Sequence, residues 1–170
     1  MNNKNTLIIW SPTFSCGVKL IDEQHKGLVK MVNEMFNHVS GDEEEEHEYF
    51  NKIIKEAVDY IKVHFATEEK IMRLTKFEGF AEHKKEHDNF VLTVVGNIFA
   101  YRAKEHFTLL TFTKFLKDRV LSHIAVMDKK YFDHFKNTAT RKANGKLSIT
   151  TADIRHDEPM PSLWAHAMRV

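Results

Sequence analysis

Apolar residues recur along this chain at the three- and four-residue spacing that is typical of amphipathic helices. Four such stretches follow one another, at about residues 19–39, 42–75, 80–103 and 108–135. Ser40, Gly41 and Asp42 separate the first two stretches, because these residues can end one helix and cap the next. Four helices of this length with short connections predict an all-α, up-down-up-down antiparallel four-helix bundle.

Ionisable residues stand in phase with these apolar stripes, where Leu, Ile or Val would be usual. In the second stretch the stripe comprises Phe50, Ile53, Ala57, Ile61, His64, Glu68 and Ile71. Over all four stretches the ionisable members are His25, His64, Glu68, His83, His87, His123 and Asp128. Burying so many such groups is unfavourable unless something compensates for it, and a bound metal is the usual compensation. The pattern therefore predicts a metal site inside the bundle.

The spacing within each helix decides which of these side chains can share a site. His64 and Glu68 are four residues apart and lie on one helix face, as do the two histidines of the third stretch. His123 and Asp128 are five apart, about 140° of rotation, so either a local π-bulge or a carboxylate approaching from another angle is needed. Five imidazoles and two carboxylates are too many for one tetrahedral zinc. They suit two six-coordinate ions, for which iron is the best match.

The residues around these positions resemble the hemerythrin family, and in particular its bacterial members. The matching segments are 21–25, 64–69, 83–87 and 123–128, in the same order and at the same separations. The resemblance covers about residues 8–135 and implies a non-haem centre of two Fe ions. It implies that one iron is bound by His83, His87 and His123, the other by His25 and His64, and that the bridges are Glu68, Asp128 and an oxo or hydroxo group.

The same resemblance implies reversible binding of O2 at the iron that has fewer protein ligands, for oxygen storage, delivery or scavenging. Phe65, Val120 and Ile124 are apolar neighbours of the ligands and would form a dry O2 pocket. The sequence shows no general acid, base or nucleophile outside the ligand set. We therefore expect a binding protein and no catalytic residues, although turnover of peroxide or nitric oxide at the same irons stays open.

Two other metal chemistries explain only parts of this pattern. His83, Glu86 and His87 match the H-x-x-E-H motif of zinc peptidases, in which Glu86 would be the general base. That interpretation leaves four of the other conspicuous residues without a role. Ferritin-like di-iron oxidases use Glu-x-x-His pairs at a spacing of three, whereas here histidine dominates and the spacing is four.

We expect structural roles for the remaining ionisable and sulfur-containing residues. The acidic run 42–46 is expected to be a solvated first helical turn, favoured by the helix dipole, and Glu69 to point into solvent from another helix face. Cys16 is interpreted as a structural thiol, and as the single cysteine it excludes an internal disulfide. The histidines expected at the surface are His38, His47, His106, His134, His156 and His166, and the methionines expected as core fillers are Met31, Met35, Met72 and Met127.

Composition limits the partners. A net charge of +1, from 25 basic and 24 acidic residues, predicts binding to neither nucleic acid nor membranes. There is no apolar run of about 18 residues and no signal peptide, so a cytoplasmic location is expected.

The end of the chain differs in kind from the bundle. Residues 1–135 are expected to form one domain, with residues 1–17 as an arm, and residues 136–170 an appended tail. Leu163, Trp164 and Met168 in this tail would make an apolar docking or self-association patch if helical. The alternative function is therefore an O2- or redox-sensing signalling module whose tail contacts a protein partner.

Overall fold

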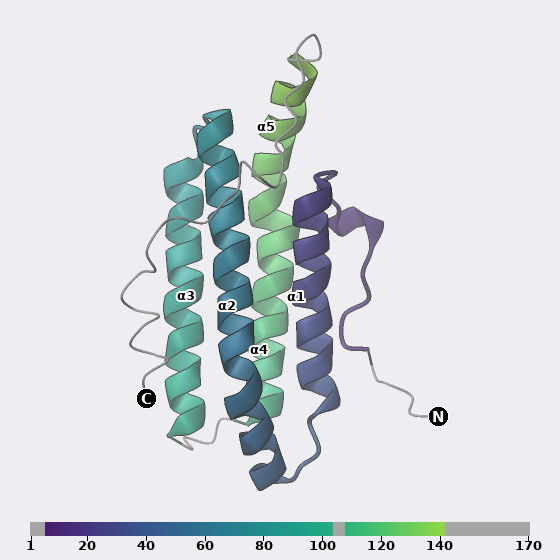
Figure 1. The fold of residues 1–170 in the computed structure, drawn as a ribbon, viewed down its shortest axis with the longest axis vertical. Helices are drawn as coiled ribbons and strands as arrows, with labels where there is room; N and C mark the ends of the chain where they lie inside the picture. The colour runs from purple at the N-terminus through teal and green to yellow at the C-terminus, as the bar shows by residue number, and fades with distance from the viewer. Residues whose placement is uncertain (1–5, 104–107, 142–170) are drawn as a thin grey trace.

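Four long helical rods lie side by side along one axis (Figure 1). The computed structural model describes residues 6–103 and 108–141. In chain order the elements are the 3-10 helix η1 (Pro12–Phe14), α1 (Lys19–Asn37), α2 (Glu43–Thr75), α3 (Phe80–Arg102), α4 (Leu109–Ser122), the π-helix η2 (His123–Met127) and α5 (Asp128–Arg141). Neighbours in sequence run in opposite directions, and α4, η2 and α5 together make the fourth rod. The all-α antiparallel four-helix bundle expected from the sequence is confirmed.

The fourth rod changes its helical geometry in the middle. Residues His123–Met127 form a π-helical turn between α4 and α5. Hydrogen bonds in such a turn span five residues instead of four, which shifts the phase of the side chains that follow. His123 and Asp128 are consequently both buried, although they are five residues apart. The π-bulge, one of the two geometries left open by the spacing, is the one that occurs.

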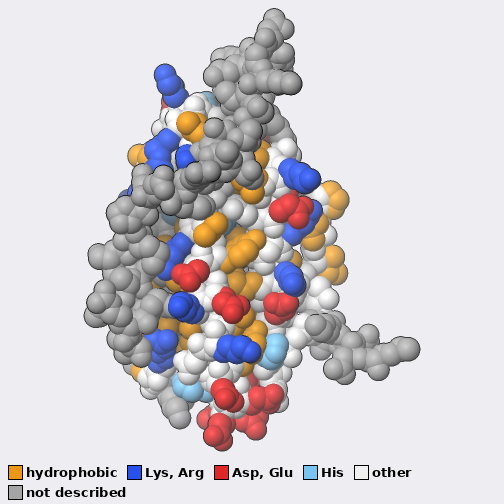
Figure 2. Space-filling model, in the orientation of Figure 1, with side chains coloured by type: hydrophobic (Ala, Val, Ile, Leu, Met, Phe, Trp, Pro, Cys, Tyr) orange, Lys and Arg blue, Asp and Glu red, His pale blue; other side chains and the backbone are white. Residues whose placement is uncertain are grey.

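Local sequence explains where α2 begins. The Asp42 side chain caps this helix, because its Oδ1 accepts hydrogen bonds from two backbone N–H groups of the first turn at 3.0 and 3.1 Å. Acidic side chains gather at the end of the molecule where α2 begins (Figure 2). Glu46 does not belong to this exposed group: it is buried, and its carboxylate accepts from two backbone N–H groups of the preceding turn, both at 2.9 Å. The expectation that the whole run is solvated is therefore wrong for Glu46.

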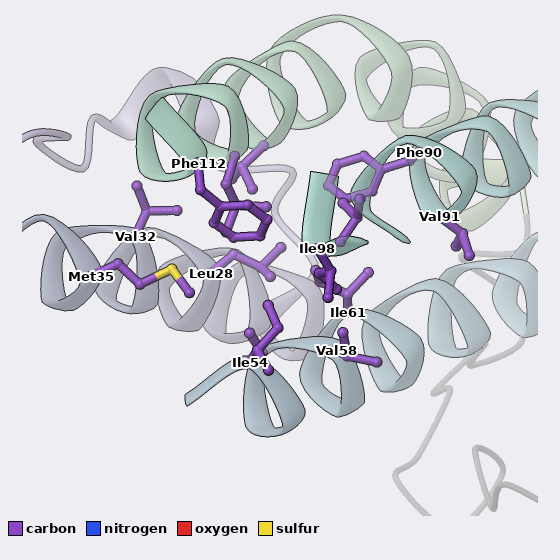
Figure 3. Packing of buried hydrophobic residues seen from close by; sticks show 14 of the residues in the cluster. Leu28, Val32, Met35, Ile54, Val58, Ile61, Phe90, Val91, Ile98 and Phe112 are labelled. Carbon is purple, nitrogen blue, oxygen red and sulfur yellow. The ribbon is translucent and has the colours of Figure 1, made fainter. Parts of the chain in front are cut away.

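Most of the interior is apolar. The larger cluster, which we call the apolar half, includes Leu28 from α1, Ile54 and Ile61 from α2, and Phe112 from α4 (Figure 3). Ile54 is buried here, whereas Ile53, which was expected in the stripe, is only partly buried at the edge of the cluster. Most of the other apolar residues that were expected in the helical stripes are buried.

A smaller apolar cluster closes the other end of the bundle. Its buried members are Cys16, Ile21, Ile71, Met72, Tyr131 and Phe132. Along α1 the order is Ile21, His25, Leu28, so a buried histidine lies between the two clusters. On α2 and on the fourth rod, which run in the opposite direction, the order along the chain is reversed, and the ionisable residues again lie between the two clusters. The ionisable residues thus occupy one layer that is covered on both sides by apolar side chains.

The segment before α1 lies along the outside of that helix (Figure 1). The Asn33 side chain pairs with it: Oδ1 accepts from the backbone N–H of Leu7 at 2.9 Å and of Ile8 at 2.8 Å, and Nδ2 donates to the Ile8 carbonyl at 2.8 Å. Closer to the helix, the carboxylate of Asp22 accepts from the backbone N–H of Cys16 at 2.7 Å. These contacts hold both ends of the segment against α1.

None of the helices in the described ranges is long and apolar enough to span a bilayer. The predicted tail begins at residue 136, but α5 continues to Arg141, past the end of the apolar pattern at residue 135. The predictions for residues 142–170, including docking or self-association, fall outside the described residues.

Candidate metal centre

The seven ionisable residues singled out from the sequence meet in one buried layer. α1 contributes His25, α2 contributes His64 and Glu68, and α3 contributes His83 and His87. The fourth rod adds one residue from each side of its π turn, His123 and Asp128. All seven side chains are buried, the most exposed at 5%. Spacing along the helices therefore identified a set that the fold brings together from all four rods.

Glu68 lies at the centre of this layer. Its Oε2 is 3.2 Å from Nε2 of His87 and 3.2 Å from Nε2 of His123. The Nε2 atoms of His64 and His83 are each 3.7 Å from the same oxygen. The other oxygen, Oε1, faces His25 Nε2 at 3.8 Å. One carboxylate is thus within reach of every imidazole of the set.

Asp128 faces the same layer from the fourth rod. Its Oδ2 lies 3.1 Å from Nε2 of His25, and its Oδ1 lies 3.4 Å from Nε2 of His83 and 3.2 Å from Nε2 of His123. The two oxygens of Asp128 thus point to histidines on different sides of the layer. This is the geometry of a carboxylate that can bridge two cations.

The donor atoms fall into two groups that share Glu68. One group contains Glu68, His83, His87 and His123, the other contains His25, His64, Glu68 and Asp128, and the atoms of each lie within 4.8 Å of one another. Bonds of about 2.1 Å place adjacent donors of an octahedral ion about 3.0 Å apart. The shortest separation here, between the Nε2 atoms of His83 and His87, is 3.0 Å.

Several buried atoms of the set have no hydrogen-bond partner among the described residues: His25 Nδ1 and Nε2, His64 Nε2, Glu68 Oε1, and Asp128 Oδ1 and Oδ2. Buried polar atoms are normally hydrogen-bonded, and each exception costs about 1–3 kcal/mol. Cations bound in the layer would remove that penalty for all of these atoms except His25 Nδ1, because His25 faces the layer through Nε2. The donor set therefore fits two metal ions.

The carboxylates of the layer favour positive charge on two of its imidazoles, whereas burial lowers the pKa of His64 well below its ordinary value. Burial alone lowers the pKa of His25, but the carboxylates of Asp128 and Glu68 outweigh it and raise the pKa to about 9. His87 behaves in the same way, with Glu68 and Glu69 raising its pKa to about 9 against burial. For Glu68, burial is opposed by the surrounding imidazoles, which hold its pKa well below the usual value.

Two of the imidazoles have a hydrogen-bond partner on the side that faces away from the layer. His64 Nδ1 lies 3.3 Å from Oε1 of Gln24, and His87 Nδ1 lies 3.1 Å from Oε1 of Glu69. Glu69 is only 14% exposed, so the expectation that it points into solvent is wrong. Glu69 follows Glu68 and so lies 100° further around the helix, a direction that here leads to α3 instead of solvent. Gln24, which precedes His25, lies in the segment 21–25 that carries the family resemblance, but nothing in the sequence assigned it a role.

Apolar side chains enclose the layer on the side of the apolar half. The Phe65 ring stacks on His87, with ring centroids 3.8 Å apart. Phe65, Val120 and Ile124, the residues expected to line an O2 pocket, are all buried members of the larger apolar cluster. None of these three side chains can donate or accept a proton.

Other candidate residues lie outside the layer. Glu86 is partly buried and belongs to neither donor group. The two histidines of the H-x-x-E-H motif instead share a donor group with Glu68 and His123, beside a second group that the zinc-peptidase interpretation does not explain. His38 is exposed, as expected. His47 and His134 are only partly exposed, and Nε2 of His134 lies 3.1 Å from the Thr75 carbonyl oxygen. The other histidines expected at the surface, His106, His156 and His166, fall outside the described residues.

Cys16 is buried in the smaller apolar cluster, with an exposed fraction of 1%. Burial raises the pKa of this thiol well above its ordinary value, so the reactive thiolate is disfavoured. This agrees with the structural role expected for it. The methionines divide into Met35 and Met72, which are buried, and Met31 and Met127, which are partly exposed.

The fold and the site together define a helical bundle built around a candidate centre for two metal ions. The family described as Hemerythrin HHE cation binding domain matches residues 16–135. The chain belongs to the hemerythrin family.

Several proteins that are similar to this chain are named hemerythrins. Bacteriohemerythrin of Methylococcus capsulatus is 30% identical over 126 residues, which cover 74% of this chain and 94% of that protein. Myohemerythrin of Theromyzon tessulatum is 31% identical over 122 residues, covering 72% and 88%. Bacteriohemerythrin of Pseudomonas aeruginosa is 34% identical over 87 residues, covering 51% of this chain. That match spans only 55%, about half, of the Pseudomonas protein.

Proposed function

We propose that this protein binds O2 reversibly at a non-haem di-iron centre, for storage, delivery or scavenging of oxygen. The observation that carries the proposal is the convergence of five imidazole Nε2 atoms on Glu68 and Asp128. Membership of the hemerythrin family supports iron as the metal and O2 as the ligand.

The two donor groups give the iron positions different numbers of imidazoles. We assign the first position to His83, His87 and His123, the second to His25 and His64, and the bridges to Glu68, Asp128 and an oxo or hydroxo group. With shared bridges, the second position has one protein ligand fewer and can accept an exogenous ligand. When bound, an iron pair supplies that coordination position and the electrons needed for O2 binding.

The chain's own contribution beyond ligation is a dry environment. Phe65, Val120 and Ile124 exclude water and carry no proton donor, which favours release of O2 intact over its reduction. We therefore infer a binding protein and not an enzyme. Steady-state assays of peroxide or nitric oxide consumption check this inference, and turnover at physiological concentrations would contradict it.

The test is anaerobic purification followed by an iron count and visible spectra under argon, under O2 and under argon again. We expect two irons per chain and an absorption band that appears with O2 and disappears when O2 is removed. His25→Ala should abolish the band, whereas His38→Ala, which changes an exposed histidine of the same segment, should leave it intact. One zinc and no iron would refute the assignment.

The sensing alternative is favoured by one observation. α5 begins at Asp128, a proposed bridge, and rises beyond the ends of the neighbouring helices (Figure 1). A change at the metal layer could therefore be transmitted along this helix toward residues 142–170. Deleting residues 142–170 should leave O2 affinity unchanged in a carrier. In a sensor the deletion should abolish an O2-dependent change in assembly or partner binding. We also propose a cytoplasmic location, which cell fractionation can check.

A further inference from the structure

We infer that Gln24 and Glu69 give the two iron positions different electronic environments, with Glu69 stabilising the more oxidised state at the His87 position. This inference rests on the proposed function only in requiring a redox-active iron pair. Both residues are positioning residues that would act on iron through an imidazole, from the side of the ring opposite the metal layer. The difference between them is one of charge, because Gln24 offers a neutral amide and Glu69 a carboxylate.

A hydrogen-bond chain fixes the orientation of the Gln24 amide. Gln24 Nε2 donates to Thr67 Oγ1 at 3.1 Å, and Thr67 Oγ1 itself donates to the Val63 carbonyl at 2.7 Å. Since the Thr67 hydroxyl proton is used in this way, the hydroxyl must accept from the amide. The carbonyl oxygen of Gln24 then faces His64, so Nδ1 of His64 carries the proton. Its Nε2 is left with a lone pair toward Glu68.

Tyr60 supports the same segment. Its hydroxyl donates to the Gln24 backbone carbonyl at 3.0 Å. The ring lies directly against Gly27, where any side chain would collide with it. This contact ties α2 to α1 one turn before His64, which helps to hold Gln24 in register with that ligand.

Glu69 fixes the tautomer of His87 more simply. A carboxylate can only accept a hydrogen bond, so Nδ1 of His87 is the donor and Nε2 faces the metal layer. Arg73 Nη1 lies 3.7 Å from Glu69 Oε2, and Lys84 Nζ lies 4.0 Å from Oε1. Both cations are more than 40% exposed, whereas Glu69 is 14% exposed, so solvent screens them more than it screens the carboxylate.

The charge difference has a direct chemical consequence. An imidazole that donates to a carboxylate becomes a stronger base toward its metal than one that donates to an amide. The His87 position is therefore better suited to the more highly charged ion. The position with the open coordination site, that of His64, lacks such a carboxylate partner in the described part of the chain. This arrangement would favour a higher charge on the iron at the His87 position than on the iron at the His64 position.

Isosteric exchanges test this inference without removing a hydrogen-bond acceptor. Glu69→Gln keeps an oxygen beside His87 Nδ1 but removes the charge, and Gln24→Glu adds a charge beside His64. Glu86→Gln is the matched control, because it removes the same charge next to His87 in sequence from a residue outside the donor groups. Redox titration of the iron-loaded proteins, followed by their visible spectra, gives the midpoint potential of each.

We expect Glu69→Gln to favour the reduced pair about tenfold, a rise of about 59 mV for a one-electron couple. Gln24→Glu should lower the potential, and Glu86→Gln should shift it much less than Glu69→Gln does. Equal shifts in Glu69→Gln and Glu86→Gln would show a general effect of surface charge and overturn the inference. So would an unchanged potential in Glu69→Gln.

A second measurement does not depend on iron or on successful folding of a variant. Nitrogen-15 NMR of the zinc-loaded wild-type protein should show a protected Nδ1 proton on both His64 and His87, with that of His87 further downfield. Absence of that proton on His87 would overturn the inference. A wild-type protein that holds two irons but does not bind O2 would contradict the proposed function alone, because its potentials could still be compared.

Discussion

Leu28, Ile61 and Phe112 meet through hydrocarbon surfaces in the apolar half, whereas one turn along the same helices His25 and His64 meet carboxylates. In the apolar half, burial itself stabilises the fold, at about 25 cal/mol per Å² of apolar surface. In the metal layer, burial of unpaired nitrogens and oxygens opposes folding. The comparison indicates that the apolar half supplies stability and that the metal layer depends on it.

The largest effect should come from Glu68, because both donor groups use it. We expect Glu68→Gln, which has nearly the same shape, to reduce metal content from two ions to none or nearly none. Elemental analysis of protein purified from iron-supplemented cells measures this. Glu46→Gln is the control, since it alters a buried glutamate of the same helix that bonds only backbone N–H groups in the described structure. Two ions in Glu68→Gln would contradict the shared-bridge assignment.

A substitution in the apolar half should reduce stability and leave the metal content unchanged. Phe112 is fully buried and packs edge-on against Phe50, with ring centroids 5.0 Å apart. Phe112→Ala should lower the free energy of unfolding by about 3–5 kcal/mol, as large-to-small core changes do. Urea denaturation of the iron-loaded protein measures it. The metal content of the folded protein should stay at two ions per chain, and a loss of metal would show that the two regions are not separable.

Metal removal should affect the two regions unequally. Ligand binding at 100 times its dissociation constant stabilises a folded protein by about 2.7 kcal/mol. Chelation should therefore lower the unfolding temperature. Amide hydrogen exchange should accelerate most in the turns that carry His64, His87 and His123, and least around Ile54 and Phe112. Uniform acceleration along all four rods would indicate that the layer and the apolar half unfold as one unit.

The smallest effect concerns two glycines that lie inside helices. A Cβ at Gly96 would meet no atom within 4 Å, whereas one at Gly27 would collide with the Tyr60 ring. Gly96→Ala should raise the free energy of unfolding by about 0.5–1 kcal/mol, because alanine favours helix. Gly27→Ala should lower it and disturb the Tyr60 contact with Gln24. Thermal unfolding of both variants measures these two stability changes. Destabilisation by Gly96→Ala would contradict the open environment at that position.

The sequence alone predicted the four rods and the seven ionisable residues that meet in the buried layer. Both depend on helical periodicity, which a run of in-phase residues such as His64 and Glu68 records directly. It could not choose between the two geometries that reconcile His123 with Asp128, because a π turn depends on tertiary packing and has no residue signature.

The surroundings of the layer were harder to predict for a related reason. Glu69 was placed in solvent because the phase of its own helix was considered without the neighbouring helix. Its true partner, His87, is 18 residues away in sequence. Gln24 and Thr67 act through contacts between α1 and α2, which no pattern within one helix records.

We propose that the seven residues hold two irons in two groups that share Glu68. Anomalous X-ray diffraction at the iron absorption edge, from crystals of the iron-loaded protein, tests it most directly. Two peaks are expected, one among His83, His87 and His123 and the other beside His25 and His64, with the Glu68 carboxylate between them. A single peak, or a metal bound to His83 and His87 without Glu68, would contradict the account.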